Sequence, residues 1–288
     1  MDGLEQKFTP RQYMINSNFE FFHYKDQPKL EVEYHNHDFY EIYFFISGRV
    51  TYIIEGKTYS LKPGDILLVN NKELHKPIVE GGPVYERFVI WVNPDFIRKY
   101  STDEVDLLMC FESTSKNKYN LLRPGTEMLS TIKNIYARLN RACMSTNYGS
   151  GILRESYLIE LMVYLNRAYI NTDLIDIEED IIYNSLVNEV IHYINNNLGE
   201  DLSLEALSQR FYTSKYHLLR EFKNHTGYTL HGYIHQKRLI AAKALLREGM
   251  RIASVCQECG FNDYSNFIRA FSKAFDISPK KYSNLFNK

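Results

Sequence analysis

LEALSQRF (Leu204–Phe211) and IASVCQEC (Ile252–Cys259) are two short segments that carry the same pattern of hydrophobic residues. In each, hydrophobic side chains stand at positions i, i+3 and i+7, a spacing that places them on one face of a helix and is not typical of a strand. The second segment begins 48 residues after the first. The pattern therefore predicts two equivalent short helices in the last third of the chain.

A break and a second helix follow each of these segments. The breaks are Tyr212-Thr213-Ser214 and Gly260-Phe261-Asn262-Asp263, and the second helices carry Phe222 and Phe271 at matching places. Ser214 and either Asn262 or Asp263 are suitable N-cap residues. Two helices joined by so short a turn cross steeply and leave one face of the second helix free, so the sequence predicts two helix-turn-helix units.

The free faces of both second helices are basic and polar. Arg220 and Arg269 are 49 residues apart and occupy matching places in the repeat. Arginine bonds guanine in the major groove and asparagine bonds adenine, although the same residues also suit an ordinary solvated face. Because the pattern occurs twice, we favour DNA binding. The predicted contact residues are Lys215, Tyr216, His217, Arg220, Lys223, Tyr264, Ser265, Asn266 and Arg269.

The same region resembles the AraC/XylS family of transcription regulators. The resemblance rests on Cys259-Gly260-Phe261, on Phe275-Asp276-Ile277-Ser278-Pro279 and on Phe222-Lys223-Asn224-His225-Thr226-Gly227, and it covers about residues 183–288. Asp276 departs from the family, in which glycine is commoner. The resemblance implies that a long helix, Thr229–Arg247, joins the units and spaces them for successive major grooves, about 34 Å apart.

The charge distribution agrees with this placement. The chain has 34 Lys and Arg against 35 Asp and Glu, but the part from Tyr183 onward holds 14 basic and 9 acidic residues, and the remainder holds 20 and 26. A basic C-terminal domain suits phosphate binding, and an acidic N-terminal one suits a sensing role.

Several classes of protein are not indicated. The N-terminal residues are polar and resemble no signal peptide, no hydrophobic run approaches bilayer length, and four cysteines are too few for a disulfide framework, so we expect a cytoplasmic protein without membrane contact. Cys256-x-x-Cys259 falls on one predicted helix without a second cysteine pair, which favours two buried side chains over a zinc site. No phosphate- or dinucleotide-binding glycine motif occurs.

From Tyr34 to Val92 the chain reads as short strands separated by turns. The expected strands are Glu41–Ile46, Val50–Ile54, Thr58–Leu61, Ile66–Val69 and Phe88–Val92. Strands at this spacing with glycine and proline turns predict a sandwich or barrel. His35-x-His37-x-x-x-Glu41 followed by Gly48 resembles the first cupin motif, and Gly64 and His75 stand where the second has its Gly and His. Asn70 and Lys72 depart from that second motif.

His35, His37, Glu41 and His75 match the positions that bind metal in cupin enzymes, so a divalent metal is one interpretation. In the other, the same groups bond each other or the hydroxyls of an organic effector, and no metal or other cofactor is present. We favour the second interpretation, with a sugar or oligosaccharide as effector, because aromatic rings can cover its C–H face. The expected effector residues are His35, His37, Glu41, Tyr43, His75 and Trp91.

Two hydrophobic helical stripes follow, over Pro124–Ala142 and Ile152–Ile170. The family resemblance implies that such a pair mediates dimerisation, and we expect Leu161 and Leu165 in the exposed stripe. The polar segment 172–182 is the expected linker. Residues 1–20 resemble the N-terminal arm that in the family can fold over the ligand.

We therefore predict an α+β protein of two domains, with an N-terminal cupin-like β-barrel that carries a helical hairpin and a C-terminal all-α tandem helix-turn-helix. The domains are 1–122 for effector binding, 123–171 for dimerisation, 172–182 as linker and 183–288 for DNA binding. The expected function is that of a sequence-specific transcription regulator that is no enzyme. Its expected partners are double-stranded DNA, a small effector, a second copy of the chain and RNA polymerase. The alternatives are a metal-dependent cupin enzyme or metal sensor fused to a DNA-binding domain, and a constitutive DNA-binding protein with a purely structural barrel.

Overall fold

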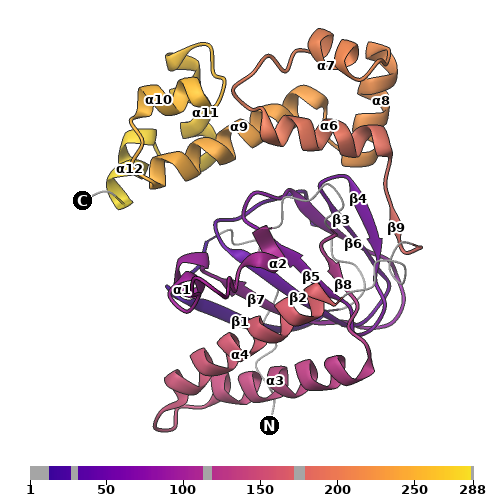
Figure 1. Cartoon of the computed structure of the whole chain (residues 1–288), viewed down its shortest axis with the longest axis vertical. Helices are drawn as coiled ribbons and strands as arrows, with labels where there is room; N and C mark the ends of the chain where they lie inside the picture. The colour runs from indigo at the N-terminus through magenta and orange to yellow at the C-terminus, as the bar shows by residue number, and fades with distance from the viewer. Residues whose placement is uncertain (1–12, 27–31, 113–118, 172–178, 287–288) are drawn as a thin grey trace. The chain divides into compact units, whose positions relative to one another are not determined.

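The computed structural model describes residues 13–26, 32–112, 119–171 and 179–286 (Figure 1). The chain forms two compact units, which are described separately below. The first comprises Met1–Ile54 and Thr58–Ile182, and the second comprises Tyr183–Lys288 together with the short segment Glu55–Lys57. Within these residues no helix is both long and hydrophobic enough to cross a membrane.

The first unit is built on two antiparallel sheets. One has the strand order β1-β7-β2-β5-β8 and the other β6-β3-β4-β9. All five expected strands are confirmed, with ends that differ by up to three residues. The strands are β1 (Phe19–Asp26), β2 (Tyr40–Ser47), β3 (Val50–Ile54), β4 (Lys57–Ser60), β5 (Ile66–Val69), β6 (His75–Val79), β7 (Tyr85–Val92), β8 (Leu121–Leu122) and β9 (Ile181–Ile182).

Strand β2 is buried on both faces. Its side chains point alternately to the two sides of the sheet, and each side is covered. Tyr43 and Phe45 point into the space between the two sheets, where they pack with Tyr52 and Trp91. Ile42 and its neighbours on the other face pack against helices. A strand covered on both sides reads as a continuous hydrophobic run, as β2 does. The interior between the sheets is thus lined by aromatic side chains.

Helices α3 (Thr126–Met144) and α4 (Ser150–Ile170) cover the outer face of the five-stranded sheet and lie side by side (Figure 1). The helical pair expected between the domains is therefore confirmed. The expectation that Leu161 and Leu165 are exposed is wrong, because both are completely buried in the core of this unit. Helical periodicity identifies a hydrophobic face but not whether the same subunit covers it.

The segments before β2 and after α4 differ in part from what the sequence suggests. Of the expected N-terminal arm and linker, residues 1–12 and 172–178 lie outside the described part of the chain. Phe19, expected in the arm, begins strand β1. Ile181 and Ile182, expected in the linker, form strand β9, which pairs with Thr58 and Tyr59 of β4.

From Tyr183 onward, all regular elements of the described residues are helices. Both helix-turn-helix units are confirmed, and Thr229 caps the long helix between them through its hydroxyl. The helices are α6 (Ser185–Asn196), α7 (Leu204–Arg210), α8 (Lys215–Thr226), α9 (Leu230–Arg247), α10 (Ile252–Glu258), α11 (Tyr264–Phe275) and α12 (Pro279–Phe286), with two shorter ones, α1 (Pro94–Arg98) and α2 (Met109–Glu112), in the first unit.

The starts of the two second helices have the expected caps. The Ser214 hydroxyl accepts a hydrogen bond from the backbone N–H of His217 at 3.2 Å, and the Asp263 carboxylate accepts one from Asn266 at 2.6 Å. These bonds satisfy N–H groups that have no partner inside the helix. Asp276 ends α11 in the left-handed conformation, with φ 54°, which explains why aspartate can replace the commoner glycine.

Candidate effector site and nucleic-acid interface

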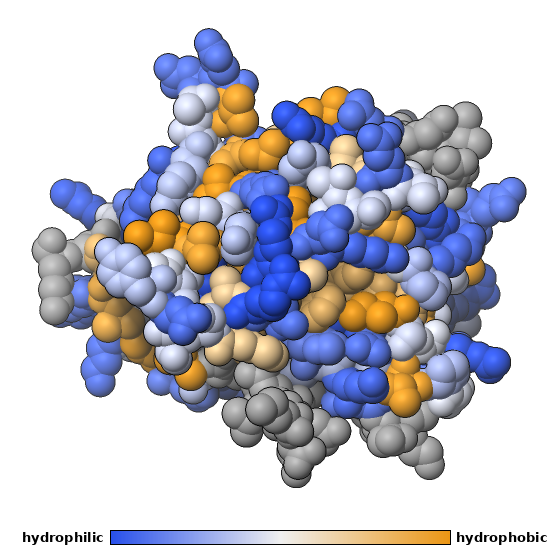
Figure 2. Space-filling model, turned by 90° about the horizontal axis from the view of Figure 1, so that it is seen from below, coloured by the Kyte–Doolittle hydropathy of each residue, from blue (hydrophilic) through white to orange (hydrophobic). Residues whose placement is uncertain are grey.

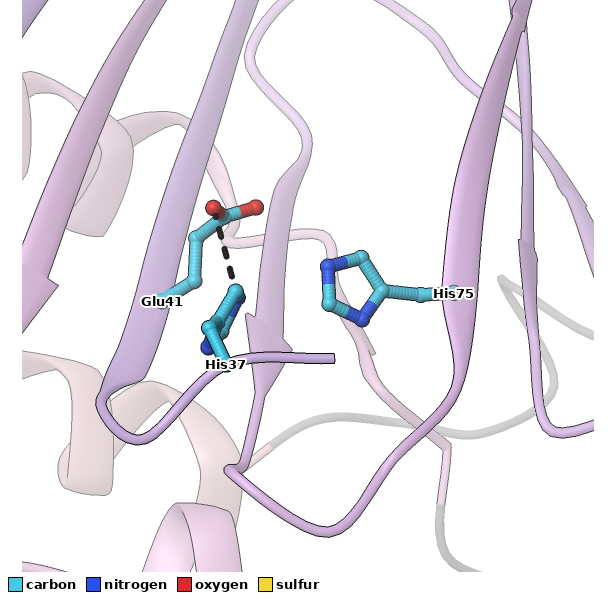
Figure 3. Close-up of side chains that lie close together, drawn as sticks. All are labelled: His37, Glu41 and His75. Carbon is cyan, nitrogen blue, oxygen red and sulfur yellow. Dashed lines mark ion pairs between the residues drawn. The ribbon is translucent and has the colours of Figure 1, made fainter. Parts of the chain in front are cut away.

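Three polar side chains meet in the interior of the first unit. His37 lies in the segment before β2, Glu41 lies in β2, and His75 is the first residue of β6. All three are buried, and their possible ligand atoms lie within 4.8 Å of one another. Figure 3 shows the His75 ring pointing from its strand towards Glu41 and His37. We call these three residues the histidine–glutamate cluster.

Backbone carbonyls fix the orientation of both imidazoles. Nδ1 of His37 is 2.8 Å from the carbonyl oxygen of Phe39, and Nδ1 of His75 is 3.0 Å from that of Glu73. A carbonyl oxygen only accepts, so Nδ1 carries the proton and Nε2 presents its lone pair. Neither Nε2 atom has a hydrogen-bond partner within the described part of the chain. The Nε2 atom of His37 lies 3.7 Å from Glu41 Oε2.

Glu41 receives two hydrogen bonds from aromatic side chains. The Tyr52 hydroxyl donates to Oε1 at 3.2 Å, and the Trp91 indole N–H donates to Oε2 at 3.1 Å. Trp91 stands directly opposite Glu41 in the pairing of β7 with β2. These bonds partly compensate the burial of a carboxylate, which is costly without partners.

Burial also determines the charge of the cluster. Desolvation, with a smaller contribution from the nearby His35, lowers the pKa of His37 to about 3 and the pKa of His75 well below its ordinary value. Desolvation raises the pKa of Glu41. At neutral pH both imidazoles are therefore neutral, the state in which they accept a hydrogen bond or bind a metal.

The other expected effector residues lie around the cluster. His35 is half-buried and forms a backbone bridge with His75, with 4.3 Å between the ring centroids, but it is not one of the three clustered ligands. His35 and His37 precede β2 and are not part of that strand, as the alternation argument assumed. Tyr43 is buried in phase with Glu41, and its hydroxyl bonds that of Tyr85 at 2.7 Å.

Two residues of the site were missed in the sequence. Tyr52 bonds Glu41, and Phe39 stacks on His37 at 3.9 Å and on Trp91 at 4.4 Å between ring centroids. The alternation of Val50, Tyr52 and Ile54 could have placed Tyr52 in the interior. For Phe39 the sequence offers no comparable signal, because it lies outside any regular strand.

The nine expected DNA-contact residues lie on two helices of the second unit. All nine are exposed on α8 and α11, whereas Leu218, Phe222, Phe267 and Phe271 are buried on the opposite faces. Each second helix thus presents a basic and polar surface with a hydrophobic anchor behind it, which is the arrangement that a groove-binding helix needs.

The cations on these helices have only weak internal partners. Arg220 pairs with the neighbouring Glu221 at 3.1 Å, Arg269 bonds Asn266, and Lys215 pairs with Glu205. Exposed ion pairs contribute little to stability, so these contacts can be exchanged for contacts with bases or phosphates.

Comparison with known proteins agrees with both halves of this description. A family model described as an AraC-like ligand-binding domain matches residues 20–162, and a helix-turn-helix domain model matches residues 207–284. The chain belongs to the AraC family of transcription regulators. Members of this family combine a ligand-binding domain with a DNA-binding helix-turn-helix domain, as this regulator does.

Among known proteins, this AraC-family chain is similar to the HTH-type transcriptional activator RhaS of Salmonella schwarzengrund. The two are 24% identical over 261 residues, which is 88% of each chain. Among solved structures, it is similar to ToxT from Vibrio cholerae, with 14% identity, a TM-score of 0.37 and coverage of 94% of this chain and 99% of that one. The DNA-binding domain of AdpA, solved in complex with a target DNA, is also similar, with 25% identity, a TM-score of 0.33 and coverage of 34% of this chain and 89% of that one.

Proposed function

We propose that this AraC-family protein is a sequence-specific transcription regulator whose binding to its operator responds to a sugar or oligosaccharide bound in the barrel. The observation that carries the effector class is the composition of the barrel interior. A carboxylate, Glu41, lies there beside the ring of Trp91 and the hydroxyl of Tyr52. Aromatic faces cover the C–H face of a sugar while polar groups bond its hydroxyls.

The effector acts by changing which arrangement of the DNA-binding units is favoured. It must bind the competent arrangement more tightly than the other, and a tenfold preference corresponds to about 1.4 kcal/mol. RhaS is named an activator. We therefore expect RNA polymerase to be a partner of the DNA-bound protein, and the cytoplasm to be its location.

A homodimer is the expected assembly, and the end of the α3–α4 pair supports it. Met144, Tyr148, Ile152 and Leu153 are hydrophobic and exposed where the two helices are joined. Figure 2, in which the molecule of Figure 1 is seen from below, shows hydrophobic residues in patches that hydrophilic residues interrupt. Exposed hydrophobic residues that lie together in this way mark a surface suited to contact with another protein.

A thermal-shift screen of sugars on the purified protein, followed by operator binding, tests the proposal. A ligand at 100 times its dissociation constant stabilises the protein by roughly 2.7 kcal/mol. We expect one sugar to raise the unfolding temperature of the first unit and to change operator occupancy. Glu41→Gln should lose this response and keep basal DNA affinity, whereas His23→Gln, a control on β1 that pairs with Glu86, should keep both. A response to no sugar, or an undiminished response in Glu41→Gln, would contradict the effector assignment.

A further inference from the structure

We propose that His37, Glu41 and His75 bind one divalent transition-metal ion inside the first unit. The inference goes beyond the regulator function, because it holds whether or not the effector is a sugar. It rests on the positions of the three ligand atoms, on the orientation of the two imidazoles and on the lack of a hydrogen-bond partner for either Nε2 atom among the described residues.

The positions of the ligand atoms suit a common ion. The three atoms lie within 4.8 Å of one another, and His37 Nε2 is 3.7 Å from Glu41 Oε2. Ligand atoms about 2.0–2.2 Å from one tetrahedral ion are about 3.4 Å apart. Small side-chain rotations therefore suffice to bring the three atoms to bonding distance.

The orientation of the imidazoles is that of metal ligands. Each Nδ1–H donates to a backbone carbonyl, of Phe39 or of Glu73, so each Nε2 lone pair is directed inwards. Histidines that bind metals almost always donate their other N–H to a carbonyl or carboxylate in this way, which fixes the tautomer and the ring.

Hydrogen bonds among the three groups cannot satisfy both imidazoles. Two Nε2 lone pairs and an ionised carboxylate are all acceptors, and a protonated Glu41 would carry a single O–H, which serves one ring at most. Both Nε2 atoms are buried without a partner among the described residues. Tyr52 and Trp91 occupy one lone pair on each Glu41 oxygen, which leaves the carboxylate able to bind a cation. A cation satisfies all three groups at once.

The set of donors also selects the kind of ion. Two imidazoles and one carboxylate suit Zn²⁺, Fe²⁺, Mn²⁺ or Ni²⁺, whereas Mg²⁺ and Ca²⁺ prefer oxygen ligands. Three protein ligands leave at least one coordination position open. An effector oxygen is the class of ligand that such a position would take.

The test uses the full chain after removal of metal with a chelator. His231 and His235, stacked on α9 with 6.3 Å between their ring centroids, could bind a transition metal at the surface. All measurements are therefore made in a His231→Gln, His235→Gln background. Titration with Zn²⁺, with Co²⁺ as a spectroscopic probe and with Mg²⁺ as a control ion, should give one equivalent of Zn²⁺ or Co²⁺, visible absorption from Co²⁺ bound to nitrogen and oxygen, and a higher unfolding temperature.

Variants assign the ion to the cluster. His75→Gln and Glu41→Gln should each weaken Zn²⁺ binding at least 100-fold, and His23→Gln should leave it unchanged. The proposal would be overturned if the background protein became saturated with Co²⁺ without developing visible absorption. It would also be overturned if Zn²⁺ bound with undiminished affinity to both cluster variants, or if Mg²⁺ bound as tightly as Zn²⁺. If the variants fail to fold, the stoichiometry and spectrum of the background protein still decide. A negative result here leaves operator binding and the sugar screen as independent tests of the regulator function.

Discussion

Tyr212 and Gly260 occupy the same backbone position in the two helix-turn-helix units. Each residue follows the C-cap of its first helix, and both are left-handed, with φ 48° and 71°. Tyr212 is fully exposed, so only its backbone is strained. A Cβ atom on Gly260 would lie 2.4 Å from the Leu198 carbonyl oxygen and 2.6 Å from Arg238 Nη2.

The two positions should therefore respond differently to substitution. Gly260→Ala adds both backbone strain and a clash, and we expect it to lower the unfolding free energy of the DNA-binding unit by more than about 2 kcal/mol. Tyr212→Gly removes the strain of a left-handed conformation, which costs about 1–2 kcal/mol for a residue with a side chain. It also increases the conformational entropy of the unfolded chain, which acts in the opposite direction. The net change in unfolding free energy should therefore be less than about 1 kcal/mol. Denaturation of both variants measures this. Equal effects would mean that the packing around Gly260 is not the deciding factor.

DNA binding should depend on the exposed arginines of α8 and α11. Arg220→Ala or Arg269→Ala should each cost about 1–3 kcal/mol of specific binding, because each is expected to contact a base edge. Lys223→Ala should weaken binding to all sequences and reduce its salt dependence, as loss of a phosphate contact does. Arg141→Ala, an exposed arginine of α3, is the control. Unchanged affinity of Arg220→Ala for the operator would show that α8 does not read the bases.

Substitutions in helix α4 should distinguish residues that hold a dimer together from residues that stabilise the core of the first unit. Ile152→Glu combined with Leu153→Glu places charges on exposed hydrophobic positions and should convert a dimer into a folded monomer, as sedimentation would show. Leu161→Asp buries a charge without a partner and should unfold the unit. A dimer that survives the double substitution would place the interface elsewhere.

The histidine–glutamate cluster predicts a pH dependence of stability in the metal-free protein. The folded pKa of His37 is about 3, and that of His75 is also lowered, so between pH 6.5 and the folded values the unfolded chain binds more protons. Stability should therefore fall as the pH drops below about 6.5, by up to about 1.4 kcal/mol per pH unit for each imidazole. Glu41 acts in the opposite sense, because its pKa is raised and its contribution is lost as the pH rises.

Denaturation between pH 5 and 7.5 in the Glu41→Gln background isolates the imidazoles. His75→Gln in that background should remove about half of the slope. His35, the other titratable group beside the two rings, is changed to Gln in a parallel series. A slope that His75→Gln leaves unchanged would assign the pH dependence to other groups.

The parts of the fold that the sequence predicted are those with local signals. The helices of the second unit follow from hydrophobic spacing and from Ser214 and Asp263 as caps. Strands β1 and β6 were not predicted, and both are at sheet edges. Pro77 interrupts the pattern of β6, which only an edge strand tolerates. Strands of two residues, such as β8 and β9, have no periodicity to detect.

The sequence pointed to the residues of the histidine–glutamate cluster but not to their arrangement. The motif pointed to His37, Glu41 and His75, but it could not show that both Nε2 atoms are left without partners. That fact depends on where Tyr52 and Trp91 place their hydrogen bonds, across strands that are distant in sequence. The burial of Leu161 and Leu165 likewise depends on packing against the sheet.

The rings of His35, His37 and His75 are all oriented by a local hydrogen bond. In each, Nδ1 bonds a backbone carbonyl only two residues away in the chain. The orientation of each ring is thus fixed within a segment of three residues and depends little on packing against distant parts of the chain. Such segments are portable: the remainder of a barrel could diverge to admit new molecules, or be redesigned to do so, while the imidazoles keep their direction.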